Sequence, residues 1–459
     1  MSRTDNLDTI MATKNNNSLV SVLHNRAFLV IWSNQILLQL SYNMLSFTLL
    51  VTLFRLTGSN TISALFLLTN LIPSTILAMF AGVIADKYDR RKILLITDIG
   101  VGLCMFSYLF LHLPIQIILM TLLLNSILQF FQPTESATIP MLVPKKDLLA
   151  ANSLFQMTLF GAMIGGYAIA GPIIDRFGNN IIFIFGSTSL IISFVLRRFL
   201  PPLPVENVRE KSSSLQGLIK LTKNHIAEGL KFITDNRYVW ATILTMAIAN
   251  ALANLVVAVG PGLMEQVLKI RAEGASIVLL LPLGLGMITG ALSVGKFGTL
   301  IARRHIIATG FFISGIGVIG IVLAPLIAGF ITGHDINFSR PVHFLNAVKL
   351  SYFISFFSII LGFGGSFVII PTQTLLQEMT PNRLRGRVFS TQIMVMGIVA
   401  AIPVFIAGAL SDLFGVQTVL FVVGSVIILC GILGLKAEKT LTSIELLLLK
   451  ITRKKLKNI

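Results

Sequence analysis

Long apolar runs alternate with short polar stretches along most of the chain. Twelve runs are each about 20 residues long, the length that a helix needs to cross the hydrocarbon core of a bilayer. Charged or Pro/Gly-containing breaks separate these runs, and the longest hydrophilic break divides them into six and six. The pattern predicts an all-α membrane protein with twelve transmembrane helices and no separate soluble domain.

The same pattern divides the chain into five segments. They are an N-terminal tail (residues 1–27), a first six-helix bundle (28–196), a linker (197–237), a second six-helix bundle (238–435) and a basic C-terminal tail (436–459). In the linker, apolar residues recur at helical spacing from Leu215 to Ile233, which predicts an amphipathic helix on the membrane surface. The N-terminal tail is polar and lacks the apolar core of a signal peptide, so we expect no cleaved leader.

A nine-residue motif recurs in the two halves. The stretch from Ala170 to Gly178 ends the fifth run, and the stretch from Ala407 to Gly415 ends the eleventh, with five of nine positions identical. Pro133-Thr134 likewise recurs as Pro371-Thr372 in the fourth and tenth runs. These repeats predict two parallel six-helix pseudo-repeats related by an axis along the membrane normal.

Composition and charge placement support a membrane protein rather than a nucleic-acid binder. Only 12% of residues are charged, against roughly 25% in soluble proteins, and 54% are hydrophobic. Of the 36 Lys and Arg residues, thirty fall on the side of the membrane that holds both termini. The other six are Arg55, Arg176, Lys269, Arg271, Arg340 and Lys349. By the positive-inside rule both termini are cytoplasmic, and the net charge of +17 reflects topology and contact with an anionic inner leaflet.

Cofactor and metal chemistry have no candidate residues in this chain. Both cysteines, Cys104 and Cys430, lie in apolar runs, and neither a Cys/His metal spacing nor a phosphate-binding glycine loop is present. We therefore expect no metal, no cofactor and no direct use of ATP.

The loop after the second run carries a glycine, an acid and a basic cluster at fixed spacing: Gly82, Asp86, Arg90, Arg91 and Lys92. It closely resembles the cytoplasmic loop motif of the major facilitator superfamily, in which such a motif acts as a gate between the two halves. Glycine allows helices to approach closely, and the acid and bases can pair across the interface. The alternative is a basic loop that serves topology alone.

Other stretches resemble the branch of that superfamily with macrolide-efflux proteins and the enterobactin exporter. They are Pro133 to Pro140 with Asn152 to Leu154, Glu228 to Ile233, and Thr380 to Ser390. The resemblance covers both halves and implies an exporter of the bacterial plasma membrane that is not an enzyme. It also implies a monomer with an amphipathic small-molecule substrate.

The fifth run resembles the Gly/Pro pattern that exporters of this superfamily carry there, at Gly165, Gly166, Gly171 and Pro172. Small residues permit tight helix packing, and a proline introduces a bend that can flex. Ordinary close packing is the alternative explanation.

Neutral polar residues form stripes on the first, fourth, seventh and tenth runs, which by resemblance line the central cavity. The candidates for substrate contact are Gln35, Gln39, Asn43, Asn125, Gln129, Asn250, Asn254 and Gln373. Spacings of three and four place the members of a stripe on one helix face. Hydrogen bonding between helices, without substrate contact, is the alternative for each residue.

Two acids lie within or at the edge of a run and are candidate proton sites: Asp98 and Glu135. We also include Asp98 in the gate motif, because we expect it to pair with Arg90 or Arg91. The fourth run has no arginine and the first has no acid, unlike many drug/proton antiporters of the superfamily, so proton coupling is doubtful and a neutral or zwitterionic substrate fits better. A lipid or lysolipid translocator and, less favoured, a membrane-embedded transferase are the alternative functions.

Overall fold

The computed structural model describes residues 20–144, 147–201, 227–267, 271–298, 301–332, 344–381 and 384–434. Within this part of the chain the secondary structure is helical and contains no strand. Twelve helices are long and apolar enough to cross a membrane. The prediction of an all-α protein with twelve transmembrane helices is therefore confirmed.

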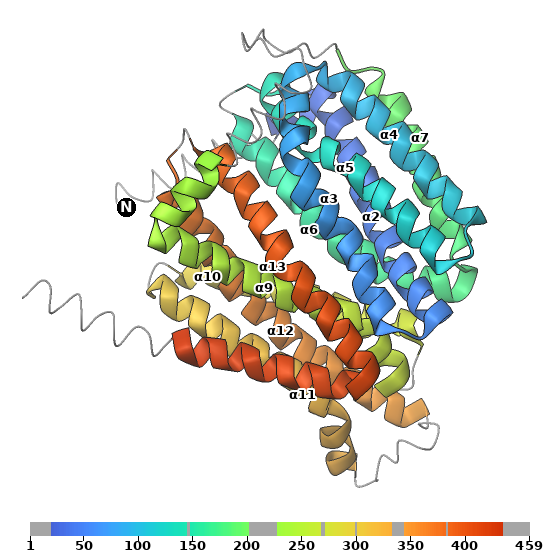
Figure 1. The fold of residues 1–459 in the computed structure, drawn as a ribbon. Helices are drawn as coiled ribbons and strands as arrows, with labels where there is room; N and C mark the ends of the chain where they lie inside the picture. The colour runs from blue at the N-terminus through green and yellow to red at the C-terminus, as the bar shows by residue number, and fades with distance from the viewer. Residues whose placement is uncertain are drawn as a thin grey trace, which may run out of the picture.

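The helices of the first half form one bundle and those of the second half another, blue to green and yellow to red in Figure 1. The first half contains α2 (Arg26–Thr57), α3 (Asn60–Lys87), α4 (Arg90–Ser107), α5 (Pro114–Leu142), α6 (Leu148–Phe177) and α7 (Asn180–Arg197). The second contains α9 (Arg237–Gly262), α10 (Leu281–Phe297), α11 (Arg303–Thr332), α12 (Phe344–Met379), α13 (Arg385–Phe414) and the helix Val416–Gly434. Short 3-10 and π-helical turns between α9 and α10 include η3 (Leu263–Val267), η4 (Ala272–Gly274) and η5 (Ser276–Leu280).

Local sequence explains several helix ends. The Asn25 side chain accepts bonds from the amides of Ala27 and Phe28 and begins α2, as Asn236 does for α9. Gly178 and Gly415, the last residues of the nine-residue motif, have φ values of 78° and 85° and follow α6 and α13. Glycine adopts this left-handed conformation without the strain a side chain would bring, so the motif ends each helix at the same position.

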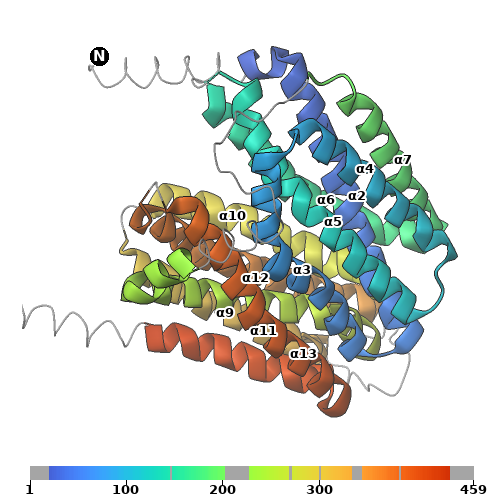
Figure 2. The ribbon, with the colours of Figure 1, turned by 45° about the horizontal axis from the view of Figure 1, so that its top comes forward.

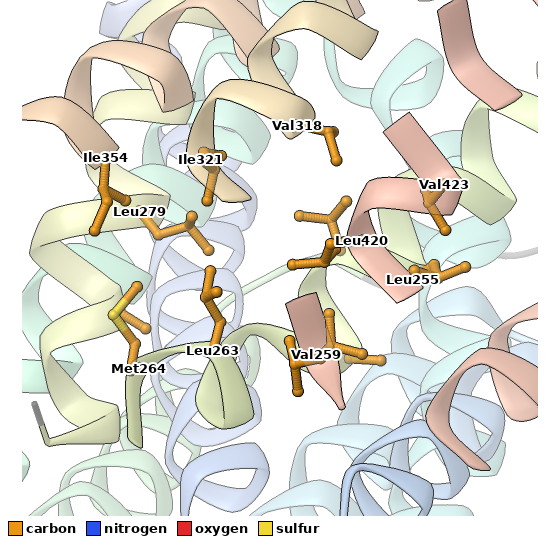
Figure 3. Packing of buried hydrophobic residues seen from close by; sticks show 14 of the residues in the cluster. Leu255, Val259, Leu263, Met264, Leu279, Val318, Ile321, Ile354, Leu420 and Val423 are labelled. Carbon is orange, nitrogen blue, oxygen red and sulfur yellow. The ribbon is translucent and has the colours of Figure 1, made fainter. Parts of the chain in front are cut away.

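The apolar core differs between the two ends of the molecule. We call the end with Lys87, Arg90 and Arg303 the basic end, and the opposite end, with Arg55 and Asp412, the far end. Consecutive helices are antiparallel, so each helix joins one end to the other. The largest buried cluster lies in the second half, where Leu255, Val259, Ile321 and Leu420 are among the residues that face one another (Figure 3).

That cluster continues from the second half into the first, where it includes Met44, Phe47, Ala64 and Ala170. Near the basic end the halves have separate clusters instead. One is around Phe28, Ile31, Ile139 and Phe155 of the first half, and the other is around Ile233, Val239, Leu376 and Val388 of the second. The described apolar core is thus shared between the halves only away from the basic end.

Two sequence predictions can be compared with the described residues only in part. Most of the predicted amphipathic helix lies outside them, since residues 202–226 are not described, although residues 227–235 are helical. The five segment boundaries stay predictions, with one change of detail: Arg197, which we placed at the start of the linker, is the last residue of α7 and is fully buried.

Candidate functional site

A cavity of about 230 Å³ lies between helices of the first half and α9 of the second. Its lining combines neutral polar groups with apolar and aromatic side chains. The residues are Tyr42, Leu45, Ser46, Leu49, Phe66, Leu67, Thr69, Asn70, Thr121, Leu124, Asn125, Tyr167 and Asn254. No charged side chain is among these described lining residues. Ligand pockets for drug-sized molecules have about 300–1,000 Å³, so in this arrangement the cavity holds a small polar group or part of a larger molecule.

A hydrogen-bond network orders the polar wall of this cavity. The Tyr42 hydroxyl donates to Asn125 Oδ1 at 3.0 Å and accepts from Asn70 Nδ2 at 2.9 Å. Asn125 Nδ2 donates to Thr69 Oγ1 at 3.3 Å. Four side chains from α2, α3 and α5 are therefore mutually bonded, which fixes their orientation toward the cavity.

Other predicted cavity residues lie beside this network. Gln129 donates to the carbonyl oxygen of Asn125 at 3.4 Å. Asn254, which lines the cavity, donates to the backbone and side-chain oxygens of Asn250 at 2.8 and 3.3 Å. In the second half, Gln373 Oε1 accepts a bond from Gln392 Nε2 at 3.5 Å.

Two side chains of the predicted stripe on the first transmembrane helix, α2, donate hydrogen bonds to backbone carbonyls of helices. Gln35 is buried and donates to the carbonyl of Phe155 at 3.5 Å. Asn43 donates to the carbonyl of Gln39 at 2.7 Å. Neither Gln35, Gln39 nor Asn43 is among the residues that line the cavity, whereas their neighbour Tyr42 is.

The glycines of the fifth transmembrane helix differ in their surroundings. A Cβ on Gly166 would lie 2.8 Å from Asn43 Cβ, and one on Gly171 would overlap Ser276 of the second half. A Cβ on Gly165 would meet no atom within 4 Å. Pro172 lies inside α6. Close packing thus requires glycine at two of the three glycine positions of this motif, and at Gly171 the contact joins the two halves.

A buried charged cluster lies in the first half, near the basic end. Arg197 Nε of α7 is 2.6 Å from Asp98 Oδ2 of α4, and Arg197 Nη2 is 4.0 Å from Glu135 Oε1 of α5. Ser193 donates to Asp98 at 3.2 Å, and the Arg197 guanidinium lies 5.0 Å from the centre of the Phe131 ring. The prediction that Asp98 pairs with Arg90 or Arg91 is therefore wrong, because the end of α7 packs on α4 at that depth.

The loop-motif residues make local contacts in the first half. Arg90 donates to the carbonyls of Ala85 and Ala137, and Arg91 donates to the carbonyl of Arg198. A Cβ on Gly82 would meet no atom within 4 Å, so the expected close helix approach at this glycine is absent from this arrangement. The side chain of Asp86 lies outside the described residues, and Lys92 is exposed.

The far end joins the two halves through polar contacts. The Asp412 carboxylate of α13 accepts bonds from the backbone amides of Asn60 and Thr61 at 2.7 and 3.0 Å, so it caps the N-terminus of α3 in the other half. Its repeat counterpart, Asp175 of α6, pairs with Arg271 of the second half. The nine-residue motif therefore contributes an aspartate to the interface from each side.

A third contact at this end involves a buried acid. Arg55 at the end of α2 pairs with Glu273 of η4, whose side chain is 3% exposed, and lies 3.6 Å from Glu265. Figures 1 and 2 show α3 beside α13, with the two bundles meeting toward the far end. The hydrogen bonds and ion pairs that join described residues of the two halves all involve this end.

Sequence reasoning missed several residues that complete these sites. The sequence pattern places Arg197 in the linker, although two acids within neighbouring helices require a buried cation. Asn70, Thr69 and Tyr167 are isolated polar residues on the second and fifth transmembrane helices, which form no stripe. Their shared signal is a polar group inside a span, which normally turns away from lipid.

Comparisons with known proteins agree with this architecture. A family model described as the Major Facilitator Superfamily matches residues 31–339. Macrolide efflux protein A of Streptococcus pyogenes is 22% identical over 411 residues, covering 88% of this chain and 94% of that protein. The staphyloferrin A transporter of Staphylococcus aureus is 27% identical over 271 residues, covering 57% of this chain and 65% of that protein.

The crystal structure of the nucleoside transporter NupG is similar in fold, with a TM-score of 0.65 at 13% identity. The match covers 89% of this chain and 98% of that one. At this identity the likeness concerns the fold alone.

Proposed function

The chain belongs to the major facilitator superfamily, and from this premise we propose that it exports small amphipathic molecules across the bacterial plasma membrane by alternating access. Its family and relatives are membrane transporters, not enzymes. The names of two relatives, a macrolide efflux protein and a staphyloferrin A transporter, support macrolide-like and siderophore-like compounds as substrates to test.

The cavity carries the proposal on the substrate. Its walls offer amide and hydroxyl groups from Asn70, Asn125, Asn254 and Tyr42 beside apolar side chains, and the described lining residues carry no formal charge. A site of this kind favours a neutral or zwitterionic molecule with an apolar body and a few hydrogen-bonding groups, because a dication would find no carboxylate to compensate its desolvation.

The uneven contact between the halves supports alternating access. The far end is joined by polar bonds and a shared apolar cluster, whereas the described core near the basic end is separate in each half. With the basic end cytoplasmic, as the charge distribution predicts, this arrangement would be the inward-facing one. Export then requires the far-end contacts to break and the basic end to close.

Counterflow in proteoliposomes tests the proposal. Proteoliposomes that contain the purified protein are loaded with an unlabelled macrolide, siderophore or lysolipid, and accumulation of the labelled compound inside them is measured. We expect accumulation of a macrolide or siderophore, reduced at least tenfold by Asn254→Leu and unchanged by Asn152→Leu, whose exposed side chain lies away from the cavity. Accumulation of lysolipid alone would favour the lipid translocator, and no accumulation of any compound would contradict transport of these classes.

A further inference from the structure

Three ionisable side chains from three helices meet inside the first half. Asp98, Glu135 and Arg197 are 1%, 4% and 0% exposed. Asp98 is the ninth residue of α4, Glu135 is seven residues before the end of α5, and Arg197 ends α7. At a rise of about 1.5 Å per residue, the cluster lies on the order of 10 Å from the basic end.

The charges of this cluster do not balance when every group is ionised. One guanidinium remains protonated in proteins, and it faces two carboxylates, which leaves a net charge of −1 in a site with almost no solvent contact. An uncompensated buried charge is costly, and a buried carboxyl group avoids this cost by binding a proton. A single bound proton makes the cluster neutral.

Geometry distinguishes the two carboxyl groups. Asp98 has the Arg197 Nε atom at 2.6 Å and also accepts a bond from the Ser193 hydroxyl. Glu135 has its nearest cationic nitrogen at 4.0 Å, beyond hydrogen-bond distance. One oxygen of each acid, Glu135 Oε1 and Asp98 Oδ1, has no hydrogen-bond partner, so the difference lies in the other contacts of Asp98. Asp98 is therefore the ionised partner of Arg197, and Glu135 is the group that gains least from ionisation.

The other described charged groups on the neighbouring helices do not pair with Glu135. Those with described side chains near the basic end are Arg26 of α2, Lys87 of α3, Asp89 before α4, Arg90, Arg91 and Lys92 of α4, Asp147 before α6, and Arg198 after α7. None of these described side chains forms an ion pair with Glu135, whose only such partner among the described residues is Arg197. The side chains of Asp86, Lys145 and Lys146 are outside the described part.

We propose that Glu135 is a proton-binding site, which carries one exchangeable proton while Asp98 and Arg197 form a permanent ion pair. The proton comes from water at the basic end and converts the Glu135 carboxylate into a carboxylic acid. Its release leaves a second carboxylate beside Arg197 and draws the guanidinium between α4 and α5.

The same helix connects this proton site to the cavity. Asn125, in the cavity wall, lies ten residues before Glu135 on α5, and Pro133 lies between them. Proline donates no backbone hydrogen bond, so the carbonyl of Gln129, four residues earlier, loses its helical partner and the helix can bend there. Resting on the proposed function, we assign to this bend the coupling between proton release and substrate binding.

Infrared spectroscopy tests proton binding without any transport assay. In an ester-free detergent near neutral pH, exposed carboxyl groups are ionised, and the spectrum should contain the carbonyl stretch of one buried carboxylic acid. Glu135→Gln and Asp98→Asn should each abolish this band, because one carboxylate then neutralises Arg197. Glu378→Gln, at an exposed acid paired with Arg303, is the matched control and should retain it.

Unchanged elution in size-exclusion chromatography identifies folded variants, and the conservative Glu135→Gln substitution is the one on which the test depends. A band that persists in folded Glu135→Gln, or is missing from the unmodified protein, would overturn the proposal. Transport provides a separate readout: a pH gradient should accelerate uptake at least tenfold in the unmodified protein and not in Glu135→Gln, while counterflow continues in both. If the unmodified protein shows the infrared band but no counterflow, the result would contradict the proposed function but not the proton site.

Discussion

The two ends of the molecule hold the bundles together differently. At the far end, Asp412 caps a helix of the opposite half, Arg55 pairs with buried Glu273, and one apolar cluster crosses between the halves. Near the basic end, the charged groups with described partners, such as Arg197 and Arg303, bond within their own half. The difference teaches that a few residues at one end maintain this arrangement, so substitutions there should change its population more than substitutions elsewhere.

Gly171→Leu should have the largest effect. A side chain at this position overlaps Ser276 and approaches the Glu273 carbonyl of the other half, and overpacking costs about 1–3 kcal/mol. At about 3 kcal/mol the far-end-closed population would fall about a hundredfold relative to the open one. Spin labels at Leu113 and Phe414, two exposed far-end positions of opposite halves, measure this by their distance distribution.

The control for this variant is Gly165→Leu on the same helix, where a Cβ meets open space. It should leave the label distance unchanged. Equal shifts in the two variants would mean that helix propensity or expression, rather than the contact between halves, controls the distribution.

Arg55→Gln should have the next largest effect. It leaves Glu273 nearly buried without its cation. Removing one partner of a fully buried pair costs about 3–5 kcal/mol, and solvent at the 40% exposed Arg55 side chain reduces this to about 2 kcal/mol. The same label pair should report a longer distance, whereas Arg176→Gln, an exposed far-end arginine, should behave like the unmodified protein.

Asp412→Asn should weaken the far end by about 1–2 kcal/mol. The amide retains hydrogen-bonding capacity but loses the negative charge at the N-terminus of α3, and bonds to charged groups contribute about 1.5–3 kcal/mol. Label distances, together with slower exchange of the Asn60 and Thr61 amides in the unmodified protein than in the variant, measure the effect. Identical amide exchange in the two proteins would contradict the capping role.

Asp175→Asn should have the smallest effect, although Asp175 is the repeat counterpart of Asp412. Its side chain and that of Arg271 are 50% and 72% exposed, and such surface pairs contribute about 0.2–1 kcal/mol. High salt should remove most of this contribution. An effect of Asp175→Asn as large as that of Asp412→Asn would show that the two copies of the motif contribute equally.

The sequence predicted the fold well because lipid imposes a simple pattern. Twelve apolar runs of spanning length give twelve helices, and the repeated motif locates equivalent contacts in the two halves, down to Gly178 and Gly415. Individual side-chain partners were harder to predict, since helix rotation and packing determine them. Asn125 and Asn254 line the cavity, whereas Asn43 of an equally regular stripe packs against Gly166.

The buried ion pair shows the same limit. Nothing in the spacing of Asp98 distinguishes the nearby Arg90 and Arg91 from Arg197, which is 99 positions away along the chain but adjacent in space because α4 packs on α7. Only the three-dimensional arrangement reveals that two acids share one arginine.

Reciprocal motion of the two ends is the central claim, and one pair of distances tests it most directly. Labels at Leu113 and Phe414 report on the far end, and labels at the exposed Phe199 and Tyr238 report on the basic end. In Gly171→Leu the far-end distance should lengthen while the basic-end distance shortens, with equal population changes. Lengthening at the far end without shortening at the basic end would contradict alternating access and indicate simple loosening of the two bundles.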